Sequence, residues 1–221
     1  MTVILVLTTF LVFIVLDYLI NRQKAVVTVP VESKASSLPA GEIVEGFLVP
    51  EELSYHPGHS WLARERKNVA RVGADEFAAT LIGKIDRIEL PKPGQWIRQG
   101  QPVVAFLRAG ETTAMVSPTE GEVLEVNAQV LQDPALLRKD PYGKGWLVTV
   151  NVPDEESTNR NLIPKGLIGE WMRDAVERLY GRQPALAGTV AATGGRPVED
   201  PVASLPDANW KDLTAEFFLT A

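Results

Sequence analysis

Short strand-forming runs alternate with glycine- or proline-containing turns between residues 51 and 154. In the run 146–152, apolar residues occupy every second position, and the run stops at Pro153. That period is typical of a strand with one face buried. Many short strands with frequent turns predict a compact β-sandwich or barrel. Further strands are expected at 83–90, 101–107 and 121–126, and short helical turns at 75–81 and 133–138, where leading aspartates can cap them.

An apolar run near the N-terminus predicts a transmembrane helix over residues 2–20. Asp17 aside, this run holds 18 uncharged residues, and at 1.5 Å rise per residue such a helix approaches the roughly 30 Å hydrocarbon core of a bilayer. Asp17 then lies near one interface. A cleaved signal peptide is the alternative, but no basic residue precedes the run and Ala25-Val26-Val27 is a poor cleavage site. We therefore expect a retained, single-pass anchor at 1–21.

Two basic residues, Arg22 and Lys24, directly follow the apolar run. Because cytoplasmic flanks carry an excess of lysine and arginine, the C-terminal domain is expected in the cytoplasm and the N-terminus outside. The localisation predicted is therefore the cell inner membrane. Residues 22–50 contain Val29-Pro30 and Pro39-Ala40-Gly41, which indicate an extended linker between bilayer and domain.

The period of the apolar residues changes to a helical one after the β-rich region. Apolar residues recur at helical spacing from Leu167 to Leu179, and Pro164 suits a first helical turn, so residues 155–182 are assigned to an amphipathic helix. Residues 183–221 are assigned to an extended tail with an apolar C-terminal segment. That segment either docks on a partner or folds back on its own domain. The candidate partner contacts are Trp171, Met172, Trp210, Leu213, Phe217 and Phe218.

Composition excludes several kinds of site. The chain has no cysteine, so disulfides, thiolate metal sites, iron–sulfur ligation and cysteine nucleophiles are ruled out. Only two histidines, His56 and His59, are present, which makes a histidine-rich metal site unexpected. A formal net charge of −6 argues against a nucleic-acid partner, because phosphate binding needs a concentrated basic surface. No phosphate loop or nucleophile–base constellation is found, so neither a catalytic nor a metal site is predicted.

Several multi-residue signatures occur in order within residues 55–154. They are Tyr55, His59 and Trp61; Val72-Gly73, Phe77 and Leu81 to Gly83; Glu89-Leu90-Pro91 with Gly94 and Gly100; Ser117-Pro118, Gly121-Glu122-Val123 and Glu125-Val126-Asn127; and Pro134, Leu137, Asp140-Pro141-Tyr142-Gly143 and Gly145-Trp146. With these residues the segment resembles the H protein of the glycine cleavage system. The resemblance implies a mainly β, lipoyl-domain-like hybrid of barrel and sandwich with short helices. His59 has no recognisable acid–base partner in the sequence and is expected to be structural.

H proteins carry lipoate on a hairpin lysine, and this resemblance directs attention to the corresponding position here. Counting back from Ser117 by the family's spacing leads to Gly110, and no lysine occurs between Lys92 and Lys139. Arg108 cannot replace it, since a guanidinium is not acylated by this chemistry. A biotin carrier also needs a lysine at such a turn. Gly110 is instead suited to a tight hairpin that needs a positive φ. We therefore expect no bound cofactor.

Three functional hypotheses follow. The favoured one is a non-catalytic, non-lipoylated, membrane-anchored accessory subunit of a larger membrane complex, of photosynthetic or respiratory type. Its H-protein-like domain would serve as a cytoplasmic protein-binding body. The alternative is a membrane-tethered carrier or docking protein in glycine cleavage or lipoate metabolism. An enzyme or small-molecule binder that reuses the fold has no supporting residues in the sequence.

Overall fold

The fold was analysed in a computed structural model, which describes residues 11–13, 15, 40–182 and 209–220. The chain divides into two units, Met1–Ser37 and Leu38–Ala221. In the first unit residues 11–13 and 15 are helical, and the remainder of the predicted anchor and most of the predicted linker lie outside the described residues. Within the described ranges, no helix combines the length and the apolar character needed to cross a membrane.

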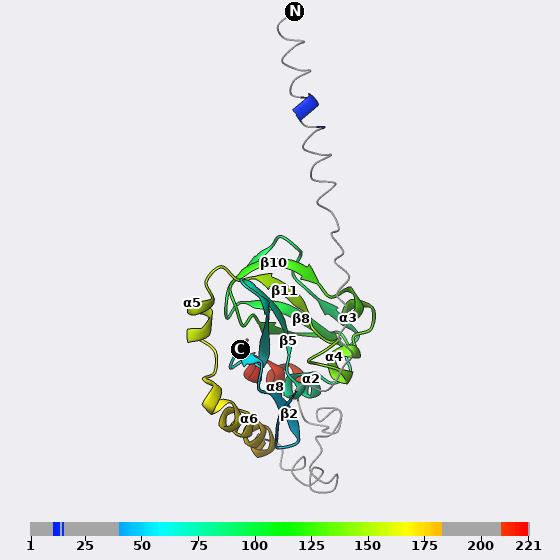
Figure 1. The fold of residues 1–221 in the computed structure, drawn as a ribbon. Helices are drawn as coiled ribbons and strands as arrows, with labels where there is room; N and C mark the ends of the chain where they lie inside the picture. The colour runs from blue at the N-terminus through cyan, green and yellow to red at the C-terminus, as the bar shows by residue number, and fades with distance from the viewer. Residues whose placement is uncertain (1–10, 14, 16–39, 183–208, 221) are drawn as a thin grey trace, which may run out of the picture. The chain divides into compact units, whose positions relative to one another are not determined.

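The second unit is built mainly from β-strands, as the sequence predicts, and Figure 1 shows their arrangement. A six-stranded antiparallel sheet has the order β3-β4-β5-β11-β10-β7, and a three-stranded sheet has the order β6-β8-β9. The larger sheet comprises β3 (Ser54–Tyr55), β4 (Ser60–Arg66), β5 (Val69–Ala74), β7 (Trp96–Ile97), β10 (Gly121–Val126) and β11 (Val148–Asn151). The smaller comprises β6 (Arg87–Glu89), β8 (Pro102–Arg108) and β9 (Glu111–Val116).

Short helices fill the gaps between strands. Helix α2 (Glu76–Ile82) begins at the predicted aspartate, because Asp75 Oδ1 accepts from Ala78 N at 2.7 Å. The second predicted turn, 133–138, overlaps only α4 (Leu136–Lys139). A helix that was not predicted, α3 (Ala128–Gln132), precedes it; Asn127 caps α3, and Pro134 stands between the two helices.

The predicted linker at 22–50 is wrong at its C-terminal end. Residues 41–50 form a hairpin of β1 (Gly41–Val44) and β2 (Phe47–Pro50). Its two-residue turn, Glu45-Gly46, has positive φ angles of 49° and 88°, as a type I′ turn requires. Val44, Phe47 and Val49 are buried in the main core, so burial of apolar residues fixes this hairpin to the domain.

The helix assigned to 155–182 is interrupted. It consists of α5 (Glu155–Arg160), a 3₁₀ turn at Lys165–Leu167 and α6 (Ile168–Arg182). The break falls just before Pro164, whose ring disfavours helical geometry in the preceding residue. The buried face of α6 packs against the main core through Ile168, Met172, Ala175, Val176 and Leu179.

A final helix, α8 (Trp210–Phe217), closes the domain beside β9 and α2 (Figure 1). Asn209 caps it, with its side-chain oxygen accepting from the backbone N–H groups of Lys211 and Asp212. The main core gathers aromatic and aliphatic side chains of α2, α6, α8, β8 and β9. A smaller apolar cluster belongs to the six-stranded sheet: Leu62, Ala70, Val72, Ile97, Val123, Val148, Val150 and Val152.

Candidate functional site

The β8–β9 hairpin is the candidate site, because the expected cofactor position falls on its tip. The strands pair from Pro102↔Val116 to Arg108↔Glu111, which leaves Ala109 and Gly110 as a two-residue turn. Both have positive φ, 49° and 84°. A type I′ turn needs this at both central positions, and it matches the twist of the flanking strands. The sequence prediction of a tight hairpin at this point is confirmed.

Two polar contacts support the turn from the segment before β6. Ala109 N donates to Asp86 Oδ2 at 2.8 Å, and Asp86 N donates to Leu107 O at 2.8 Å. Arg108 donates from Nη1 to Ile82 O at 3.1 Å. The hairpin is therefore fixed at its base, while the turn residues Ala109 and Gly110 are exposed.

The tip has room for a side chain but carries no amine. A Cβ added at Gly110 would meet no atom within 4 Å among the described residues. No lysine occurs on either strand, since the nearest in sequence are Lys92 and Lys139. Without a primary amine, the tip cannot form the amide bond by which a carboxylic-acid cofactor is attached.

Comparison with known proteins places this hairpin in a family. The glycine cleavage H-protein family model matches residues 53–174, more than half of the chain. The chain belongs to the glycine cleavage H-protein family. The resemblance seen in residues 55–154 is thus confirmed, and the match continues into α6.

The chain is similar to individual H proteins. The glycine cleavage system H protein of Bifidobacterium longum is 34% identical over 108 residues, which are 49% of this chain and 78% of that protein. The H protein of Carboxydothermus hydrogenoformans is 33% identical over 118 residues, 53% of this chain and 90% of that protein. A crystal structure of an H protein from Mycobacterium marinum has 26% identity and a TM-score of 0.48, covering 56% of this chain and 95% of that one.

His59, one of the family-matching residues, has a partner that the sequence did not reveal. Its Nδ1 lies 2.8 Å from Asp75 Oδ2, and both side chains are fully buried. The ring stacks between Phe77 and Trp171, with centroid separations of 4.4 and 4.6 Å. The expectation that no acid–base partner exists is wrong. The structural role is nonetheless favoured, because aromatic rings cover both faces and no substrate can reach the imidazole.

A buried polar network continues from Asp75 toward the β1–β2 hairpin. Tyr142 donates its hydroxyl to Leu48 O at 2.7 Å and accepts from Glu76 N at 3.0 Å. Burial raises the pKa of the Tyr142 phenol well above its usual value, and the charge of Asp75 adds to this shift. Burial raises the pKa of Tyr55 in the same way. Both phenols therefore stay neutral and act as hydrogen-bond donors, which is a structural rather than a catalytic arrangement.

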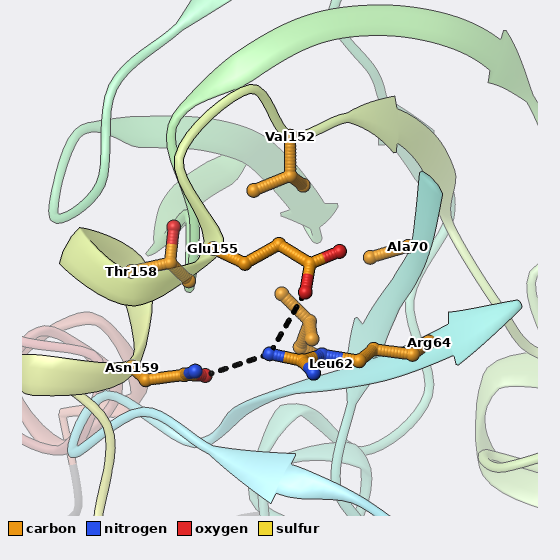
Figure 2. Close-up of a pocket in the computed structure, with 7 residues that line it drawn as sticks. All are labelled: Leu62, Arg64, Ala70, Val152, Glu155, Thr158 and Asn159. Atoms are coloured by element: carbon orange, nitrogen blue, oxygen red, sulfur yellow. Dashed lines mark hydrogen bonds and ion pairs between the residues drawn. The ribbon is translucent and has the colours of Figure 1, made fainter. Parts of the chain in front are cut away.

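A pocket lies between the six-stranded sheet and α5, and Figure 2 shows the residues that line it: Leu62, Arg64, Ala70, Val152, Glu155, Thr158 and Asn159. The guanidinium of Arg64 points at Glu155 Oε2, 3.1 Å away, and donates to Asn159 Oδ1 at 3.4 Å. The charged groups therefore satisfy each other, and the remaining lining is mostly apolar. Among the described residues, no cluster of three or more histidine or carboxylate side chains could hold a metal ion.

The residues predicted to contact a partner are mostly in the core of their own domain. Trp210, Leu213, Phe217, Phe218 and Met172 are buried, and Trp171 is half-buried against His59. Of the two alternatives for the C-terminal segment, the structure has the segment folded back on its own domain. Helix α8 packs its buried side chains against α2 and β9, and α6 packs its own into the main core. Contact of these residues with a partner stays a prediction.

Proposed function

We propose that this chain is a non-catalytic, non-lipoylated member of the H-protein family that acts as a protein-binding body. One observation supports the proposal above the others. Gly110, in a type I′ turn, occupies the position at which the resemblance to H proteins implies a lipoyl-lysine. The hairpin, the scaffold signatures and their spacing are retained around this position. A fold kept after the loss of its attachment residue is expected to serve through its surface.

The proposal includes a membrane-tethered location. The apolar run of residues 2–20 favours an anchor, and Arg22 and Lys24 favour a cytoplasmic position for the β domain. The partners proposed are subunits of an integral membrane complex, of photosynthetic or respiratory type. Protease added from the periplasmic side of sealed spheroplasts should leave the β domain intact, and its digestion would overturn this orientation.

The second candidate is a carrier or docking protein in glycine cleavage, and family membership is the observation that favours it. The relatives named above are glycine cleavage system H proteins. A docking role in that system does not need the lysine, whereas a carrier role does.

Purification from the native host in mild detergent distinguishes these candidates. The accessory-subunit proposal expects an intact-protein mass without a lipoyl group, together with copurifying membrane subunits. A lipoyl adduct would overturn the proposal. Copurification with glycine cleavage enzymes alone would favour the second candidate.

A further inference from the structure

Helix α8 carries its apolar residues on one face. Trp210, Leu213 and Phe217 are spaced by three and four residues, so their side chains stack along one side of the helix. They are buried, and so is Phe218, the residue that ends the helix. Lys211 and Asp212 on the opposite face are exposed. Helix α8 is thus amphipathic, and its apolar face packs against the rest of the domain.

Side chains of α2, α6 and the β8–β9 strands make up the surface on which α8 packs. Phe217 packs edge-to-face on Phe77 of α2 with 5.2 Å between centroids, and Arg178 of α6 lies over the same ring at 5.2 Å. Phe218 meets Phe106 of β8 at 6.4 Å. We refer to this surface as the α8 groove.

One end of the α8 groove coincides with the base of the candidate hairpin. Trp210 Nε1 donates to Ile82 O at 3.1 Å, and Arg108 donates to the same carbonyl at 3.1 Å. The Arg108 guanidinium also lies 5.9 Å from the centre of the Trp210 ring. Helix α8 and the residue that leads into the hairpin turn therefore share one hydrogen-bond acceptor at this end of the groove.

Helix α8 lies outside the part of the chain that the family shares. The family match ends at residue 174, and 47 residues follow it. The match to the Carboxydothermus relative already covers 90% of that protein, so a segment of this length has no room there. The α8 groove is thus formed largely by family-shared elements, whereas its occupant is specific to this chain's C-terminal extension.

The connection between α6 and α8 consists of the 26 residues 183–208, which include four prolines and three glycines. Because this connection holds α8 on the same chain as the α8 groove, docking of the helix is an intramolecular event. A helix held in this way needs only modest intrinsic affinity to stay docked. It can also be displaced by a helix that binds more tightly.

We propose that the α8 groove is a binding site for an amphipathic helix of a partner protein, and that α8 is its built-in, displaceable occupant. The ligand class is a helix with large apolar side chains at positions i, i+3, i+7 and i+8, the spacing that α8 itself uses. This inference deepens the proposed binding role and rests on it. The partner helix binds in the α8 groove, and α8 occupies that groove until the partner displaces it.

The test uses the full-length chain in mild detergent and a fluorescein-labelled peptide of residues 207–221. In a Trp210→Ala/Phe217→Ala double variant, the chain's own helix no longer holds the groove, and the peptide should bind at least tenfold more tightly than to the wild-type chain. A Lys211→Ala/Asp212→Ala variant changes only the exposed face of α8 and should exclude the peptide as the wild type does. A peptide lacking both aromatic anchors should bind neither protein. Failure of the peptide to bind a folded double variant would overturn the proposal.

A second measurement covers the case in which the double variant does not fold. A protease site inserted between Gly194 and Gly195 of the full-length chain separates α8 from the domain after folding. The cleaved fragment should exchange with labelled peptide while the domain keeps its thermal transition. Release of the fragment only when the domain unfolds would refute the proposal. A lipoyl adduct on the native chain would refute the proposed function instead, so the two failures are distinguishable.

Discussion

Restoring a lysine at the hairpin tip tests whether loss of carrier chemistry is confined to one residue. Gly110 has φ +84°, a region in which an L-residue pays about 1–2 kcal/mol. No described atom lies within 4 Å of an added Cβ, so no steric cost is added to this backbone strain. Gly110→Lys should therefore fold, with a loss of about 1–2 kcal/mol in the free energy of unfolding.

The assay is incubation of the purified variant with lipoate, ATP and a lipoate–protein ligase, read by intact-protein mass. Gly110→Lys should gain the mass of one lipoyl group, and the wild-type chain should gain none. Gly110→Arg imposes the same backbone strain without an acylable amine and should remain unmodified. Gly94→Lys places a lysine on another open, positive-φ turn and should also remain unmodified. If the Gly110→Lys chain folds but stays unmodified, the view that only the lysine at the hairpin tip was lost is refuted.

Three further outcomes are expected. His59→Gln should lower the free energy of unfolding by about 1–3 kcal/mol in denaturant titrations, since it leaves the fully buried Asp75 carboxylate poorly paired; an unchanged midpoint would contradict this. Burial lowers the pKa of His56, so the unfolded chain binds more protons and stability falls as pH drops below about 6.5; His56→Asn should lose less stability than wild type between pH 7.5 and 5.5, and an equal loss would be contrary evidence. On the proposal that α8 undocks as a unit, the Trp210→Ala/Phe217→Ala double variant should lose clearly less free energy of unfolding than the sum of the two single losses, and additive losses would argue against undocking.

The hairpin was predictable from sequence because its determinants are local. The apolar strand predicted at 101–107 and the Ala109-Gly110-Glu111 tip that follows it place the turn, and the family's spacing from Ser117 leads to Gly110. The β1–β2 hairpin was missed although its turn residues, Glu45-Gly46, are also local. The nearby proline and glycine favoured a linker, and burial against the core decided the structure.

The His59–Asp75 pair depends on strand pairing, which local patterns do not show. The register Ser60↔Ala74 between β4 and β5 places the two residues opposite each other, and Asp75 N donates to His59 O at 3.1 Å. Their separation of 16 residues in sequence carries no such information. Helix α8 corrects the assignment of residues 183–221 to an extended tail. The apolar character of this segment was predicted, but its helix was not, and only the tertiary structure identifies α2 and β9 as the elements that cover its apolar face.

Native mass spectrometry of the chain released from host membranes tests the central claim most directly, because one spectrum reports both modification and partners. A non-lipoylated binding body predicts the unmodified mass of the chain within an assembly that contains membrane subunits. A free chain that carries a lipoyl group would contradict the account.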